Sequence, residues 1–136
     1  MENRNLKITN PEGIYDPTAH GYSHVSRIKA NTDLVYIAGQ GGSNLDSVLS
    51  DDFKTQVEIV FKNIELALNS EGLQFADVAK LTTLVVDYDE EKHEILIEVS
   101  KGIWPDGKFP VNTLIPVSRL ALSGMQIEID ATAVCK

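Results

Sequence analysis

The 136-residue sequence is poor in cysteine and in basic residues, and both shortages exclude classes of protein. Its one cysteine, Cys135, excludes an intrachain disulfide, so nothing points to an oxidising compartment. Twelve lysines and arginines oppose twenty aspartates and glutamates, which gives a net charge of −8. A protein with this balance lacks the basic footprint that attracts nucleic-acid phosphates or anionic lipids. We therefore expect no nucleic-acid partner and no membrane partner.

Long apolar runs are also missing. No stretch approaches the roughly 20 apolar residues that cross a bilayer, and the first five residues lack the apolar run of a signal peptide. These features predict a soluble, cytoplasmic protein. Apolar residues make up 43% of the chain, which is ordinary globular usage, and the length suits one domain over residues 1–136.

The spacing of apolar residues predicts the order β-β-β-α-β-α-β-β. We expect the second and third strands to form a hairpin around Asn31 and Thr32. Ser50 or Asp51 is the expected N-cap of the first helix, and Asp87 or Asp89 that of the second. The predicted strands cover 6–9, 23–30, 33–39, 79–86, 110–115 (ended by Pro116) and 125–134, and the predicted helices cover 52–70 and 89–101.

The last predicted strand alternates most clearly. Ile127 and Ile129 fall on one face, and Glu128 and Asp130 fall on the other. Two right-handed crossovers onto one small sheet would place both helices on the same face. This predicts an α+β fold with a single mixed β-sheet and two helices packed on one face. The other face also carries aliphatic side chains, so we expect it to be covered in an oligomer.

Few residues outside this pattern indicate chemistry. If the face that carries Glu128 lies in a subunit interface, burial would suit its carboxyl group for proton transfer; otherwise Glu128 simply faces water. The loop from Gly39 lacks the lysine of a phosphate-binding loop, although its backbone can donate to a small polar ligand. His20, His24 and His93 lack metal-ligand spacing. We expect no metal site and no cofactor.

Five segments, in this order, resemble the reactive-intermediate deaminase family (Rid, also called YjgF-like). They lie at the family's spacing and span roughly residues 20–134. The segments are Gly21-Tyr22-Ser23-His24, Val35-Tyr36-Ile37-Ala38-Gly39-Gln40, Lys80-Leu81-Thr82-Thr83-Leu84-Val85-Val86-Asp87, Phe109-Pro110-Val111-Asn112-Thr113 and Ile127-Glu128-Ile129-Asp130-Ala131-Thr132-Ala133.

The resemblance implies a homotrimer of chorismate-mutase-like subunits with a pocket at each subunit interface. Members of the family hydrolyse reactive enamines and imines, such as 2-aminoacrylate, to a 2-keto acid and ammonia without a cofactor. The resemblance assigns the attacking water to Glu128 as the catalytic residue. It assigns substrate binding to Tyr22, to the backbone of Gly39 and Gln40, and to position 112.

This sequence departs from the family at position 112. Where the family has an arginine that grips a substrate carboxylate, this chain has Asn112, which is neutral and cannot form a two-pronged charged clamp. We therefore expect a hydrolase, or deaminase, of imine or enamine metabolites that does not grip a carboxylate as the main deaminase group does. The alternative is a non-catalytic trimer that binds a small molecule. Some members of the family carry labels such as endoribonuclease, so a third alternative is a role directed at RNA. The acidic net charge disfavours that alternative.

Overall fold

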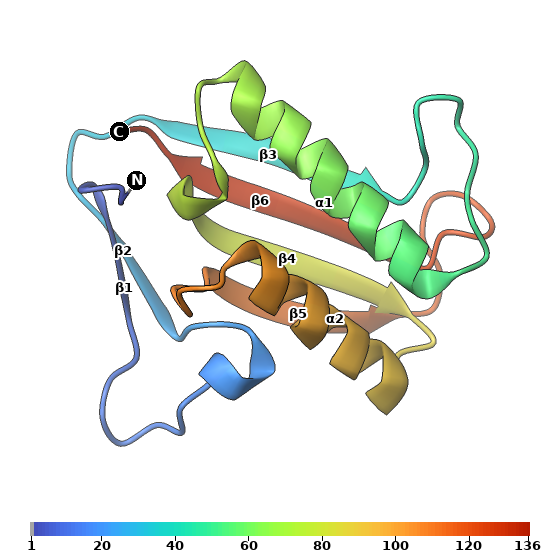
Figure 1. Ribbon diagram of the computed structural model, residues 1–136, viewed down its shortest axis with the longest axis horizontal. Coiled ribbons are helices and arrows are strands. Elements are labelled where there is room, and N and C mark those ends of the chain that lie inside the picture. The colour runs from blue at the N-terminus through green and yellow to red at the C-terminus, as the bar shows by residue number, and fades with distance from the viewer. Residues whose placement is uncertain (1) are drawn as a thin grey trace.

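Two amphipathic helices and six strands account for most of the regular structure of residues 2–136, the part of the chain that this computed structural model describes (Figure 1). The strands are β1 (Leu6–Thr9), β2 (Val25–Ile28), β3 (Leu34–Gly41), β4 (Val78–Val86), β5 (Val111–Val117) and β6 (Ile127–Val134). The α-helices are α1 (Phe53–Ser70) and α2 (Glu90–Ile103), and the 3-10 helices are η1 (Thr18–His20) and η2 (Phe75–Asp77).

Each α-helix begins at an aspartate whose carboxylate accepts a hydrogen bond from the backbone N–H three residues later. Asp52 caps α1 with a bond of 3.0 Å, so the expected caps, Ser50 and Asp51, were one or two residues early. Asp89 caps α2 with a bond of 2.8 Å, which confirms that prediction. No helix within residues 2–136 is long and apolar enough to cross a membrane.

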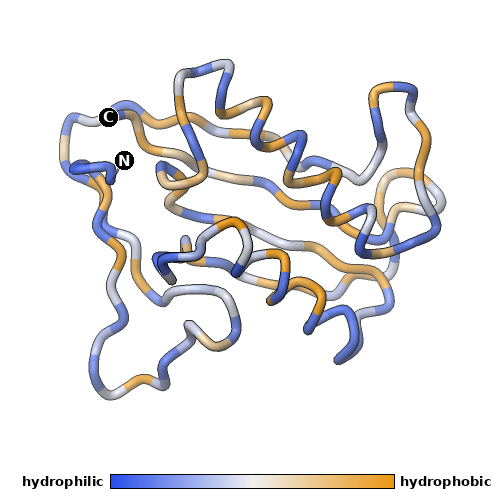
Figure 2. Tube along the Cα trace, in the orientation of Figure 1, coloured by the Kyte–Doolittle hydropathy of each residue, from blue (hydrophilic) through white to orange (hydrophobic). Residues whose placement is uncertain are grey.

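Both helices cover the same face of a four-stranded mixed sheet with the order β3-β6-β4-β5 (Figure 1). β6 runs antiparallel to β3 and to β4, whereas β4 and β5 are parallel. Apolar and polar residues are interspersed along both helices (Figure 2), and the buried apolar residues face the sheet. The core face of β6 is almost fully buried, as the alternation predicted: Ile127, Ile129, Ala131 and Ala133 are at most 2% exposed. The α+β class and the two helices on one face are confirmed.

The predicted hairpin between the second and third strands is wrong. β2 pairs with β1, and together they form a separate two-stranded sheet, whereas β3 pairs with β6. The turn at Asn31, which has a φ of 59°, leads the chain from one sheet to the other. The Ser26 hydroxyl donates to the Ala79 carbonyl at 2.6 Å and fastens the two-stranded sheet to the start of β4.

Pro116 does not interrupt the strand that contains it. It lies inside β5 and pairs in register with Val85 of β4. Proline lacks a backbone donor but is tolerated in a strand at the edge of a sheet. Within the described residues, β5 has only β4 as a neighbour in its sheet, so the missing donor breaks no ladder.

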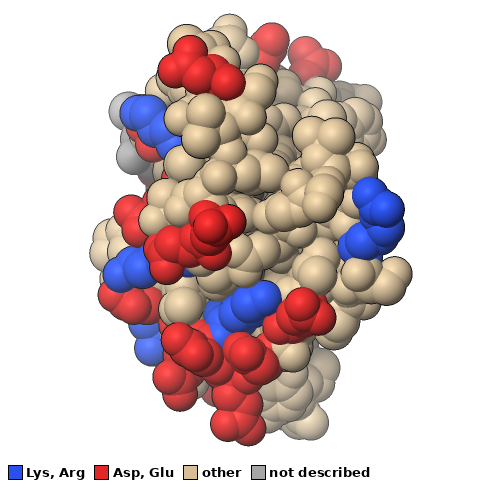
Figure 3. All heavy atoms as spheres, turned by 90° about the vertical axis from the view of Figure 1, so that its right-hand side faces the viewer, with Lys and Arg blue, Asp and Glu red and all other residues tan. Residues whose placement is uncertain are grey.

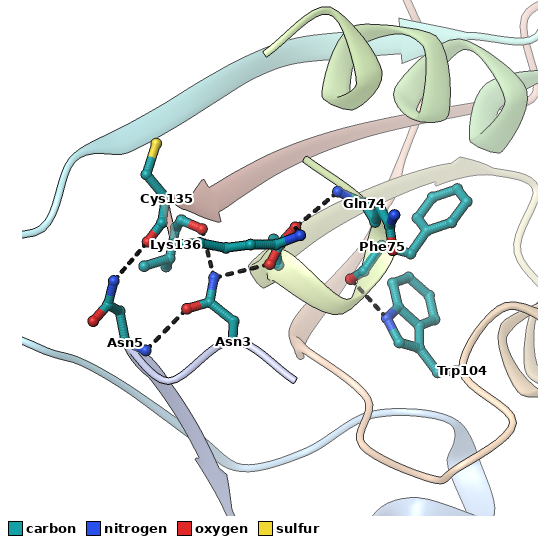
Figure 4. A network of polar contacts seen from close by, with 9 residues as sticks. Asn3, Asn5, Gln74, Phe75, Trp104, Cys135 and Lys136 are labelled. Atoms are coloured by element: carbon teal, nitrogen blue, oxygen red, sulfur yellow. Dashed lines mark hydrogen bonds and ion pairs between the residues drawn. The ribbon is translucent and has the colours of Figure 1, made fainter. Parts of the chain in front are cut away.

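A buried polar network holds the two ends of the described chain together (Figure 4). The Asn3 side-chain amide donates to the Asp77 carboxylate at 2.9 Å and to the Val134 carbonyl at 2.7 Å. Asp77 is fully buried; it also accepts from the Gln74 backbone at 2.8 Å and lies 3.7 Å from the Lys136 ammonium. Buried polar groups need such partners, so Asn3 ties the N-terminal residues to β6 and to η2.

We predict that Asn3→Ala lowers the free energy of unfolding by about 1–3 kcal/mol, because it deprives the buried Asp77 carboxylate and the Val134 carbonyl of a donor. Asn5→Ala is the matched control, since Asn5 is only partly buried and donates to one carbonyl, that of Cys135. Urea denaturation measures both variants. Equal losses for the two would contradict a special role for Asn3.

Candidate functional site

The structure divides the predicted site residues between the two faces of the sheet. Glu128 lies on β6 between two buried isoleucines that point toward the helices, so its own side chain points to the open face. Its backbone pairs with Leu84 of β4 and with Gly41 of β3. The carboxylate is partly buried by its neighbours on this face.

Gly39 makes room for the Glu128 carboxylate. The register of β3 against β6 shifts between Ile37 and Gln40, so the backbone is irregular at Gly39. A Cβ atom at Gly39 would lie 2.7 Å from Cδ of Glu128 and 3.0 Å from its Oε2. The structure therefore brings Glu128 and Gly39 together, whereas the Gln40 side chain turns back to donate to the Ala38 carbonyl at 3.0 Å.

Tyr22 and Asn112 lie at a different place, at the edge of the sheet beside α2. We call residues 10–24 the arm. Its end lies beside β5, where the Ser23 backbone N–H donates to the Pro110 carbonyl at 3.2 Å and Ser23 forms a parallel bridge to Val111. Both residues line a cavity of about 340 Å³, which we call the Asn112 cavity. Its other lining residues are His20, Gly21, Phe61, Leu81, Thr83, Tyr88, His93, Leu96, Ser100, Thr113, Leu114 and Ile129.

Asn112 itself is held by a polar neighbour beneath it. The Thr83 hydroxyl, which is 2% exposed, donates to the Asn112 amide oxygen at 3.0 Å. Asn112 pairs in register with Leu81, whose side chain is buried on the helix side of the sheet, so Asn112 faces the helix side and not the side of Glu128. Its amide NH₂ group is left to donate to a ligand in the cavity.

The sequence did not predict a cluster of histidine and tyrosine rings beside the Asn112 cavity, of which His20, Tyr22, Tyr88 and His93 line it. The His20 and His93 ring centroids are 5.6 Å apart, and the Tyr88 hydroxyl lies 2.5 Å from Nδ1 of His93. His24 stacks edge-on against Tyr15 and Tyr22, with centroids 5.0 and 5.6 Å away. The three histidines of the chain and three of its four tyrosines thus meet where the arm approaches α2.

The two tyrosines at the cavity remain protonated at neutral pH. Burial and the hydrogen bond with the Tyr15 hydroxyl raise the pKa of Tyr22 to about 12. Burial, with a smaller contribution from the charge of Asp89, also raises the pKa of Tyr88. Each hydroxyl is therefore a hydrogen-bond donor over the physiological range.

The residues that line the Asn112 cavity form no metal site and include no lysine or arginine. Within residues 2–136 no group of three or more His, Cys, Asp or Glu side chains is placed to hold a metal ion. Arg119 does not line the Asn112 cavity; its guanidinium donates to the Leu120 carbonyl at 3.1 Å beside another hollow. It does not take the place of an arginine at position 112.

The chain belongs to the family described as Endoribonuclease L-PSP, whose model matches residues 14–135 and which includes the Rid, or YjgF-like, proteins. It is 32% identical to the RutC family protein YjgH of Escherichia coli (strain K12) over 114 residues, which cover 84% of this chain and 82% of that protein. It is 30% identical over 103 residues to a RutC family protein of Aquifex aeolicus, covering 74% and 80%. The crystal structure of YyfB from Yersinia pestis, a Rid-family protein of unknown function, matches with a TM-score of 0.89 and 29% identity over 96% of this chain and 99% of that chain.

We predict that Gly39→Ala leaves the fold intact and displaces the Glu128 carboxylate, because the atoms nearest to the new Cβ, which are Cδ, Cγ and Oε2 of Glu128, belong to a flexible side chain that can move away. The expected loss in unfolding free energy is below about 1 kcal/mol, with a changed side-chain NMR signal of Glu128. Gly42→Ala is the contrast, since its Cβ would lie 2.7 Å from the Gln56 Cα and should cost about 1–3 kcal/mol. A Glu128 signal that does not move in Gly39→Ala would refute the contact.

Proposed function

We propose that this chain hydrolyses reactive imine or enamine metabolites in the cytoplasm, giving a carbonyl compound and ammonia without a cofactor. The proposed active form is a homotrimer in which each pocket takes residues from two neighbouring copies. Family membership supports the general activity, and the division of the site residues supports the shared pocket.

The observation that carries this proposal is the position of Glu128 on the face opposite to Asn112. Within one chain the sheet separates the carboxylate from the Asn112 cavity, so they cannot act on the same molecule. A second copy whose open face packs against the β5 edge would bring its own Glu128 and Gly39 toward the cavity. The site is therefore incomplete without the second copy.

The open face carries the apolar surface that such packing needs. Tyr36 is 77% exposed, and Leu34 and Ile115 are 39% and 43% exposed, although all three lie in strands of the main sheet. Large exposed apolar residues that share one face of a sheet are typical of a protein interface. Burial of this face would also desolvate Glu128, which suits a group that moves a proton.

The proposed chemistry uses one carboxylate and neutral donors. The substrate is attacked as its protonated imine, which an enamine forms by taking up a proton at carbon. Glu128 accepts a proton from water as the water oxygen attacks the carbon of the C=N bond, which leaves a neutral carbinolamine. Glu128 returns that proton to the nitrogen, the C–N bond breaks and ammonia leaves, and the hydroxyl group gives its proton back to Glu128 as the carbonyl forms. Tyr22 and the Asn112 amide hold the substrate by donating hydrogen bonds to it.

The family description names an endoribonuclease, but the surface of this chain does not favour RNA. The net charge is −8, and acidic side chains gather around the start of α2, where Asp89, Glu90 and Glu91 lie (Figure 3). Binding along an RNA backbone depends on lysine and arginine side chains that neutralise its phosphates. A small molecule in the shared pocket is the substrate that this charge distribution supports.

We predict that Glu128→Gln lowers the rate of ammonia release by at least 100-fold on a panel of imines with and without a carboxylate, because glutamine keeps the shape of the side chain and loses the base. The measurement is a coupled ammonia assay on imines generated in place, and Asp130→Asn, two residues along the same exposed face, is the control. Equal rates for wild type and Glu128→Gln would remove the proposed role. Ligand-induced stabilisation without ammonia release from any imine would favour the non-catalytic alternative.

We predict that sedimentation equilibrium gives three times the 15.0 kDa chain mass and that Tyr36→Glu shifts this mass toward one chain. The charge would be placed on β3, on the face that we propose to be buried, where its desolvation is costly. Leu66→Glu is the matched control, because Leu66 is 57% exposed on α1, on the helix side. A monomeric wild-type protein would contradict the shared pocket.

A further inference from the structure

The Asn112 cavity has a buried apolar floor and a polar mouth. Phe61, Leu81, Leu96 and Ile129 line it and are at most 8% exposed. Most of its polar groups come from the segment before β2 and from the region of α2, and His20 among them is exposed. Asn112, on β5, is partly exposed, whereas the Thr83 hydroxyl is buried beneath it. A ligand that enters would therefore place an apolar group inward and a polar group toward the mouth.

The lining carries no fixed charge. Histidine is its only titratable residue type besides tyrosine, and no Lys, Arg, Asp or Glu of the described chain contributes to it. A carboxylate moved from water into such surroundings without a cation loses several kcal/mol of hydration. The cavity therefore disfavours an acid and favours an uncharged molecule of the same shape.

His93 supplies a directed donor at the mouth. Its Nδ1 is engaged by the Tyr88 hydroxyl, which stays protonated and can donate to it. With Nδ1 as acceptor, the neutral ring carries its hydrogen on Nε2. That N–H and the NH₂ group of Asn112, both from residues that line the cavity, suit the nitrogen or oxygen acceptor of a neutral ligand.

We propose that the Asn112 cavity selects carboxylate-free imines, enamines or related carbonyl compounds whose apolar substituent is larger than a methyl group, with His93 and Asn112 holding the polar end. This rests on the proposed function, because it names the substrate class of the same site. Selection by the apolar floor concerns the substituent, and selection by the uncharged lining concerns the head group. The two contributions are separable by experiment.

The test uses stable probes and the full chain at pH 8, where imidazole side chains are generally neutral. The probes are 3-phenylpropanamide, propanamide, which lacks the ring, and 3-phenylpropanoate, which replaces the amide by a carboxylate. Isothermal titration calorimetry should show 3-phenylpropanamide binding at least tenfold more tightly than either of the others. Equal affinity for propanamide would overturn the size selection, and equal or tighter binding of 3-phenylpropanoate would overturn the charge selection.

Two variants test the residues. His93→Phe keeps an aromatic ring and removes the donor, so the affinity for 3-phenylpropanamide should fall about tenfold. His24→Phe is the same chemical change at a histidine that packs against Tyr22 without lining the cavity, so it should lower the affinity much less than His93→Phe does. Asn112→Arg adds a cation, so it should reverse the preference in favour of 3-phenylpropanoate; thermal unfolding checks that both cavity variants fold. Equal losses in His93→Phe and His24→Phe, or no reversal in a folded Asn112→Arg, would overturn the assignment.

Ammonia release is measured separately from these binding affinities. The expected probe selectivity without ammonia release from any imine would keep the cavity assignment and refute hydrolysis. Ammonia release from 2-iminopropionate, together with no binding of 3-phenylpropanamide, would keep hydrolysis and refute the substrate class named here.

Discussion

The alternation of side chains along β6 is the constraint on which the fold and the proposed site both depend. β6 is hydrogen-bonded to β3 on one side and to β4 on the other, so its side chains can leave only above or below the sheet. Burial of Ile127 and Ile129 under the helices therefore sends Glu128 to the open face. A slip of one residue would bury the carboxylate and expose both isoleucines, so the hydrophobic core also fixes the position of the acid.

Patterns that are local in sequence predicted the elements correctly. Helical spacing located both helices to within about two residues, and alternation located the last strand and its buried face. Strand pairing was not predictable in this way. β3 joins β6, with Leu34 opposite Val134, and the turn at Asn31 has the same residues whether it closes a hairpin or leads from one sheet to another. Pairing depends on which distant strand buries the core face, and no local pattern contains that information.

The site residues, too, include some that could be predicted from the sequence and some that could not. The resemblance to a family marked Glu128 and Gly39, and the structure places them in contact across the irregular register of β3 and β6. The ring cluster was missed because its contacts join η1 to α2, so that His20 meets His93 far along the chain. The three histidines lack metal-ligand spacing. Their relevance lies in ring contacts between elements, which spacing along the sequence does not indicate.

Asn112 is more than the absence of an arginine. The Thr83 hydroxyl beneath it is almost fully buried and needs an acceptor, and the Asn112 amide oxygen is that acceptor. A guanidinium has no acceptor atom, so an arginine at this position would leave Thr83 to find another partner. Leu114, two residues further along β5, adds apolar surface to the same cavity. Thr83, Asn112 and Leu114 thus form a consistent neutral environment, and this consistency supports a site built for an uncharged ligand over one that lost its charged clamp by a single substitution.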